Sequence, residues 1–311
     1  MLTISEGIWA KVEATKGVDA VPTAADAVLV SGQSWKNEGL EMIERADEVG
    51  SGLGADRQAL YGSNLKTVTF DWKARGSGAA GTAPEADALL RMCAMAVTNV
   101  PSTSDTYNPV SDFDTQETGT IYYLHKGIVH KMTGCVGTFT TTLETNGVVK
   151  FSFTVTGHDA EVADSSFTAG SYLTTKAPVV KGAAFTVGGY AASINSLAFD
   201  YGANISMPKD MNQTDGFGVM GITKFSPKGS FDPLMVTAAT NDYLGDFKAG
   251  TNMALDTGVI GTTAGNRLQI QMPGIYYTDA SPGDREGFRT YEIPYGATDS
   301  SGDDFVSLIF T

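Results

Sequence analysis

Residues Gly119 to Gly157 read GTIYYLHKGIVHKMTGCVGTFTTTLETNGVVKFSFTVTG and contain two runs in which apolar and polar residues alternate. The runs meet at Asn146-Gly147, a dipeptide that readily adopts the positive φ angles of a tight hairpin turn. The return run has two faces, apolar Phe151, Phe153 and Val155 against polar Lys150, Ser152 and Thr154. The stretch therefore predicts an antiparallel hairpin with one face on a core and the other towards water or a neighbour.

The chain repeats this pattern 140 residues later. Residues 131–159 align without a gap on residues 271–299, so that the triplet Phe151, Phe153, Val155 falls on Tyr291, Ile293, Tyr295. Upstream, Thr69-Phe70-Asp71 has a counterpart in Ser230-Phe231-Asp232, and helix-like segments follow at 84–95 and 241–249. The shared order of elements predicts a tandem duplication of one β-rich unit.

The composition limits the classes of function. The chain has 311 residues and a net charge of −14, with 12 basic and 19 acidic residues before Ala160 and 9 and 16 after it, so each half carries −7. Such a charge disfavours a surface that grips phosphates. The two cysteines are far apart and indicate no disulfide framework, which fits synthesis in a reducing cytoplasm. We expect neither a secretory signal nor a membrane span.

The pattern of Gly, Pro and apolar runs divides the chain into four parts. We expect an N-terminal arm over residues 1–34, a first β domain over 35–160, a linker over 161–182 and a second β domain over 183–311. The fold class is mainly β, as two tandem antiparallel β-sandwich or barrel units, each with a flanking helix. The segment 100–118 is expected to be a polar loop. The apolar run 305–310 predicts a strand that is paired, because an exposed apolar edge would aggregate.

Three motifs invite a chemical interpretation, and each has a structural one that fits better. The glycines of Gly76–Gly81 follow a strand with polar alternation and stop short of the next helix, so we expect a flexible loop and no dinucleotide cofactor. His125 and His130 would share a sheet face if Tyr123 pairs with His130, but no third metal ligand accompanies them. The segment 299–304 lacks the carboxylate spacing of a calcium loop and is expected to be an acidic turn. His158 is expected on the surface.

No arrangement of nucleophile, base and acid stands out in the remaining sequence. The chain has three histidines and lacks the GxSxG, HExxH and phosphate-loop patterns. We therefore expect a protein that is not an enzyme and that needs no cofactor or metal.

The lead-in EATKGVDAVPTAADAVLV, followed by YYLHKGIVHKMTGCVGTFTTTLETNGVVKFSFTVTG, resembles the major tail proteins, or tail tube proteins, of long-tailed and non-contractile bacteriophages. The resemblance covers the first half, and the second half matches through the internal repeat. It implies a β-sandwich with a flanking helix whose inner sheet pairs with neighbouring subunits to close a ring. It also implies that rings stack into a hollow virion tube for genome ejection, in contact with tail terminator, tape-measure and distal tail proteins.

The resemblance and the repeat together suggest an assembly and candidate residues. Ordinary members carry one unit per chain and six chains per ring, so a duplicated chain suggests a trimer with pseudo-sixfold symmetry. The candidate lumen-facing residues are Thr138, Thr140, Thr142, Lys150, Ser152 and Thr154, past which DNA would slide without specific binding. The candidate inter-ring residues are Glu48, Asp56, Arg57, Lys209, Asp210 and Asp215, together with the arm.

Two alternatives remain open at the level of sequence. An inner-tube protein of a contractile tail or a secretion apparatus would have a similar fold. A carbohydrate-binding β-sandwich would need an exposed aromatic platform, whereas Trp9, Trp35 and Trp72 are scattered through the first half.

Overall fold

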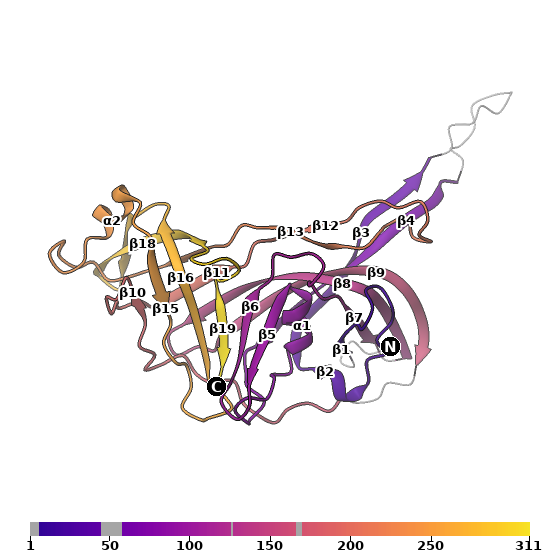
Figure 1. Ribbon diagram of the computed structural model, residues 1–311, viewed down its shortest axis with the longest axis horizontal. Helices are drawn as coiled ribbons and strands as arrows, with labels where there is room; N and C mark the ends of the chain where they lie inside the picture. Colours follow the sequence, from indigo (N-terminus) through magenta and orange to yellow (C-terminus); the bar gives the residue numbers. More distant parts are fainter. Residues whose placement is uncertain (1–5, 45–57, 126, 166–169) are drawn as a thin grey trace.

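The computed structural model describes residues 6–44, 58–125, 127–165 and 170–311, and antiparallel strands dominate it (Figure 1). The strands of the N-terminal half are β1 (Glu6–Val12), β2 (Ala27–Val28), β3 (Val30–Ile43), β4 (Leu60–Lys73), β5 (Met95–Val100), β6 (Ser104–Pro109), β7 (Gly119–His125), β8 (Gly127–Glu144) and β9 (Lys150–Ser165). Those of the C-terminal half are β10 (Thr186–Val187), β11 (Ser196–Asp200), β12 (Ala203–Ser206), β13 (Gly221–Phe225), β14 (Lys228–Phe231), β15 (Met253–Asp256), β16 (Leu268–Tyr277), β17 (Ser281–Arg285), β18 (Phe288–Thr298) and β19 (Ser307–Phe310). The short helices are η1 (Ala24–Asp26), α1 (Asp87–Met92) and α2 (Tyr243–Ala249). The predicted class, mainly β with a helix in each half, is confirmed. Among the described helices, none has the length and apolar character that crossing a membrane requires.

The predicted hairpin is the pair β8 and β9. Its turn places Asn146 at a φ of 64°, the left-handed conformation that the Asn-Gly dipeptide favours. Phe139 of β8 stands opposite Phe153 of β9, and both side chains are buried. The ring of Phe139 lies 5.4 Å from that of Phe151, centroid to centroid. Each buried Phe contributes about 2 kcal/mol relative to exposure, so this apolar face fixes which side of the hairpin meets the core.

The two halves share one pairing register. Gly137 of β8 opposes Val155 of β9, and Tyr277 of β16 opposes Tyr295 of β18, which is the same pair shifted by 140 residues. A slip of one residue in either half would turn its whole apolar set to the wrong face.

The same correspondence holds one strand further out. Phe70 of β4 opposes Phe153 of β9, and their counterparts Phe231 of β14 and Ile293 of β18 oppose each other. The order β4, β9, β8 in the first half is therefore matched by β14, β18, β16 in the second, as the internal repeat predicts.

The two halves are joined by continuous strand pairing. The C-terminal part of β8 pairs with β11, and the last strand, β19, lies between β16 and β6. The predicted pairing of the apolar run 305–310 is thus confirmed for its β19 part. Phe310 packs on Trp72 and Tyr107 of the N-terminal half, with ring centroids 6.4 and 5.9 Å away. A single core of buried side chains runs through both halves.

Several local predictions differ from the structure. Residues 6–12, expected in an irregular arm, form β1 and pair along their length with β7. The expected polar loop contains β6, because Asp105, Tyr107 and Pro109 are buried at alternate positions. Helix α1 begins at Asp87, later than expected, because residues 84–87 form a turn in which the N–H of Asp87 donates to the carbonyl of Pro84.

The glycine-rich loop lies between the two halves. The N–H of Gly76 donates to Asn266, and the N–H of Gly78 donates to the carbonyl of Gly265. A Cβ at position 76 would lie 2.1 Å from the carbonyl oxygen of Gly265. These contacts require a close approach of two backbones, and they give the glycines a structural role.

Candidate functional site

The six candidate lumen-facing residues share one face of the β8–β9 hairpin. They form three directly opposed pairs, Thr138 with Thr154, Thr140 with Ser152, and Thr142 with Lys150. The side chains of Thr140 and Thr142 are exposed, and the other four are half-buried. The opposite face of the same strands carries the buried phenylalanines, so the alternation in the sequence separates a polar surface from the core.

This surface continues without a break across both halves; we call it the polar face. One row of directly opposed residues crosses seven strands through Asp71, Ser152, Thr140, Asp200, Lys228, Gly296 and Tyr276. The crossing point between the halves is the pairing of Asp200 with Thr140. The duplication thus produces a single polar surface from two repeated units.

Two lysines of the polar face lie close to carboxylates of the same face. The ammonium group of Lys150 lies 3.3 Å from the carboxylate of Asp71, which also accepts a 2.6 Å hydrogen bond from Ser152. Lys228 lies 3.8 Å from Asp200. The charges of Lys150 and Lys228 are therefore partly offset, which weakens the attraction of these two lysines for phosphate groups.

The polar face is hollowed where the halves meet. An open hollow of about 720 Å³ is lined by residues 140–142 of β8, 198–200 of β11, 227–229 around β14 and 294–297 of β18. Its lining includes Tyr276, whose side chain is 43% exposed. The hollow is broad and open, so it suits contact with a large surface better than enclosure of a small molecule.

The loop 208–218 lies against the β3–β4 hairpin of the same chain. Lys209 forms an ion pair with Glu41 of β3, and the carboxylate of Asp215 contacts Nδ1 of His158. Phe217 is buried together with Leu65 of β4. Of the other candidate inter-ring residues, Asp210 accepts the N–H of Asn212 within its own turn. Glu48, Asp56 and Arg57 lie outside the described residues.

His158 was expected on the surface, and this prediction is wrong. Its side chain is only 18% exposed, because the 208–218 loop covers it. Nothing near His158 in the sequence indicates a partner 57 residues away.

The other two histidines lie as the sequence predicts. Tyr123 opposes His130 and His125 opposes Ile128, so the two rings share a face, with centroids 5.9 Å apart. Burial, and then the charge of Lys66 at 3.3 Å, lower the pKa of His130 below its usual value. Within the described residues, no group of three metal-ligating side chains occurs.

Glu13, which was not among the residues predicted from the sequence, anchors the N-terminal segment. Its buried carboxylate accepts hydrogen bonds from the N–H groups of Gly17 and Gly134 and from the hydroxyls of Thr118 and Thr120. Four donors to one carboxylate fix residues 13–17 onto β7 and β8. A single acidic residue in a mixed segment gives no sign of partners more than a hundred positions away.

The acidic segment 299–304 forms a turn held by its own carboxylates. Asp304 accepts the N–H groups of Ser300 and Ser301, and Asp299 accepts those of Asp304 and Phe305. Slight burial acts to raise the pKa of Asp304, but the hydrogen bonds outweigh it and lower that pKa. This is the acidic turn that the sequence predicts.

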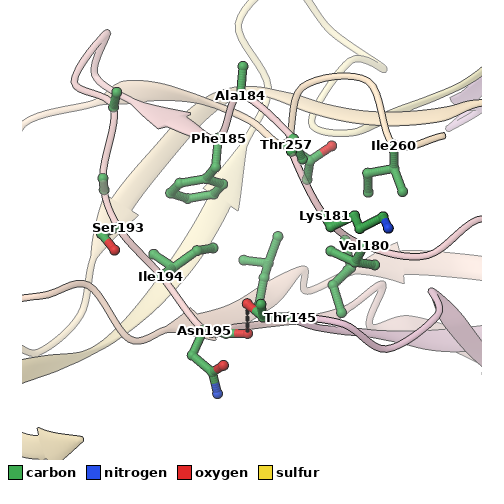
Figure 2. A pocket seen from close by; sticks show the side chains of 16 residues that line it. Thr145, Val180, Lys181, Ala184, Phe185, Ser193, Ile194, Asn195, Thr257 and Ile260 are labelled. Atoms are coloured by element: carbon green, nitrogen blue, oxygen red, sulfur yellow. Dashed lines mark hydrogen bonds between the residues drawn. The ribbon is translucent and has the colours of Figure 1, made fainter. Parts of the chain in front are cut away.

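A cavity of about 370 Å³ lies where the linker meets the end of β8 (Figure 2). Phe185, Ile194 and Ile260 line it, and the Thr145 hydroxyl donates to the carbonyl of Asn195 at its rim. Lys181 is its single ionisable side chain among the described residues. The cavity therefore has no pair of groups for acid–base chemistry.

Comparison with known proteins identifies a family for the chain. None of the curated proteins compared with the chain matches it. A family model described as "Phage tail tube protein" matches residues 6–301, which include both halves and the whole polar face. The chain therefore belongs to the phage tail tube protein family.

Proposed function

We propose that the protein is the structural subunit of the tail tube of a long-tailed, non-contractile bacteriophage. In this proposal rings of the protein stack into a hollow tube through which the genome passes into the host. The observation that carries the proposal is the polar face, which runs in one register from β4 to β16. A surface of this kind, backed by a continuous core, suits the lining of a conduit.

The internal repeat suggests three chains per ring. Each chain supplies two units with the same strand order and register, so three chains would supply six equivalent positions. In this proposal the two units are the predicted domains, residues 35–160 and 183–311. The partners beyond the chain itself would be the tail terminator, tape-measure and distal tail proteins, and assembly would start from subunits made in the bacterial cytoplasm.

The polar face supplies the lumen surface. Threonine and serine hydroxyls predominate among the six candidate residues, and the lysine in the set is paired with Asp71. DNA would meet few uncompensated cations there and would slide without specific binding.

The β3–β4 hairpin and the loop packed on it supply the contacts between rings. Figure 1 shows the hairpin projecting beyond the rest of the molecule. The 208–218 loop packs along the hairpin through the buried Phe217, and Lys209 forms an exposed ion pair with Glu41 near the end of the described part of β3. A projecting hairpin of this kind reaches a neighbouring ring more easily than the body of the molecule does.

Electron microscopy of the purified protein over a concentration series tests the proposal. Averaged end-on views should show hollow rings or tubes with threefold modulation of a sixfold outline. Six full chains per ring would contradict the trimer while retaining the tube. A compact monomer at every concentration would contradict the tube itself.

A further inference from the structure

Several strands of the described residues pair on one side alone, and two of them, β3 and β17, end the sheet that carries the polar face. β3 pairs with β4 on one side alone, and β17 pairs with β18 on one side alone. β3 is 14 residues long, and its Trp35 side chain is 40% exposed. Long open edges of this kind are templates for pairing with another chain.

The internal repeat relates these two edges to a pair of strands already in contact. β11 lies beside β14 as β3 lies beside β4, so β11 is the counterpart of β3. β17 lies beside β18 as the end of β8 lies beside β9, so β17 is the counterpart of that end. β8 and β11 pair with each other inside the chain.

We propose that β17 of one subunit pairs antiparallel with β3 of a second copy of this chain, in the register of the β8–β11 contact. This inference rests on the proposed function, and it names the surfaces that join the subunits of a ring. Each chain has one edge of each kind, so the contact is head-to-tail and closes a ring when its rotation allows.

The register follows from residue correspondence. Thr140 opposes Ser152, and Ser281 opposes Glu292, the residue 140 positions after Ser152, so by pairing Ser281 takes the place of Thr140. The ungapped alignment would set Ser281 against Thr141, but between Tyr277 and Ser281 the chain has one residue more than the matching part of β8. In the second half, Asp200 opposes Lys228. The first-half counterpart of Lys228 is Thr67, and Thr67 is opposed by Lys36. Lys36 therefore takes the place of Asp200. Because Thr140 opposes Asp200 within the chain, Ser281 opposes Lys36 of the next subunit.

In this register Pro282 opposes Trp35 of the next subunit. The β17–β3 contact then has one hydrogen bond fewer than the β8–β11 contact within the chain. Tyr291, opposite Pro282, donates its N–H to Pro233 on the far side of β18. Directly opposed residues alternate between bonding to each other and pointing apart, so the backbone of Pro282 faces the open edge. Its carbonyl accepts the N–H of Trp35, while its ring nitrogen has no proton to give. The lost donor also discourages pairing with unrelated strands.

Disulfide formation between the two edges tests the register. The variant carrying Lys36→Cys and Ser281→Cys is assembled into tubes, oxidised, and run on a gel without reductant. Directly opposed residues lie within disulfide reach, about 4.5–5.5 Å between Cα atoms. The native Cys93 and Cys135 are fully buried and do not compete. We expect covalent dimers and a ladder that ends at three chains and collapses on reduction.

The matched control moves one cysteine along the same face. Glu38→Cys with Ser281→Cys separates the pair by two further residues of β3, about 6–7 Å, so it should cross-link poorly. Equal cross-linking by both variants would overturn the register.

The outcomes separate this inference from the proposed function. Tubes that form normally without cross-links would overturn the β3–β17 contact and leave the tube function standing. Wild-type protein that never forms rings would overturn the function.

If the cysteine variant does not assemble, a benzophenone amino acid at position 35 in tubes serves instead. Its adduct should map to residues 280–284 of a second chain, and an adduct elsewhere would overturn the contact.

Discussion

The carboxylate of Glu13 accepts a 2.8 Å hydrogen bond from the backbone N–H of Gly134, across 121 positions of sequence. Glu13→Ala removes this bond and leaves buried donors on Gly134, Thr118 and Thr120 without a partner. We expect the free energy of unfolding to fall by about 2–4 kcal/mol, because each buried unsatisfied group costs about 1–3 kcal/mol and partial relaxation recovers some of it.

Urea denaturation of the dilute protein measures this loss. Glu13→Gln is the control, because it keeps one acceptor oxygen and the side-chain shape, and it should cost less than Ala. Equal stability of wild type and Glu13→Ala would show that these bonds do not hold the N-terminal segment.

Arg75 and Glu85 form a buried ion pair under Trp72. Their side chains are 9% and 5% exposed, and the guanidinium lies 2.6 Å from the carboxylate. Glu85→Ala leaves the buried guanidinium of Arg75 without its carboxylate partner. We therefore expect the free energy of unfolding to fall by about 3–5 kcal/mol, as measured by thermal or urea unfolding.

The exposed pair Lys131 and Glu161 is the matched control for this measurement. At 2.6 Å it is equally short, but Glu161 is 57% exposed. Glu161→Ala should therefore cost about 0–1 kcal/mol. Similar losses in the two variants would mean that burial does not determine how much the Arg75–Glu85 pair contributes to the free energy of unfolding.

The sequence predicts elements whose signal is local or repeated. The β8–β9 hairpin follows from alternation around Asn146-Gly147, and the register of β16 and β18 follows from the repeat of 140 residues. The polar face follows from the same alternation. These features need only neighbouring residues or a second copy of the pattern.

The features that could not be predicted depend on distant partners. β1 has a short, mixed sequence and is held by its pairing with β7, more than a hundred residues later. The alternation of buried and exposed residues in β6 cannot be recognised from the sequence, because Asp105 is polar yet buried. Asn99 donates a hydrogen bond to its carboxylate. His158 is covered by a loop that a local reading cannot bring to it.

Phe217 holds the 208–218 loop onto β4. It is 5% exposed and packs with Leu65 and Met220. Phe217→Ala should release the loop, with a local cost of about 3–5 kcal/mol. Hydrogen exchange of residues 208–218 should rise, while exchange in β8 and β9 stays unchanged.

Lys209→Ala is the control for the loop, because its ion pair with Glu41 is exposed and contributes little. If the braced hairpin joins rings, Phe217→Ala should give single rings in place of tubes under the electron microscope. Tubes of normal length with a released loop would contradict the inter-ring role.

His130 makes stability depend on pH. Its pKa is lowered in the folded protein by burial, by Lys66 and by His125, while Asp159 opposes them. The neutral form is therefore favoured on folding, so its contribution is present above the unfolded pKa, near 6.5, and is lost as the pH falls through the folded pKa.

Replacing His130 by Asn removes this titration. Between pH 7 and pH 5, the free energy of unfolding should fall less in His130→Asn than in wild type, as measured by urea denaturation at each pH. Parallel pH profiles would show that His130 does not contribute to the acid sensitivity.

Lysines added to the polar face test whether it lines the tube. Thr140 and Thr154 lie on neighbouring strands of this face, and in a ring of three the variant Thr140→Lys with Thr154→Lys adds six cations. Assembled tubes of the variant should retain short duplex DNA at low salt. Six phosphate contacts would make that binding fall about 10³-fold between 50 and 200 mM salt.

The control Ala238→Lys with Ala239→Lys adds the same charge in the exposed segment before α2 and should bind less DNA inside tubes. Because a lumen surface is reached only through the tube ends, binding by the Thr140 and Thr154 variant should also slow as tubes lengthen, whereas binding by the control should not. A rate independent of tube length would place the polar face on the outside and contradict its role as the lining.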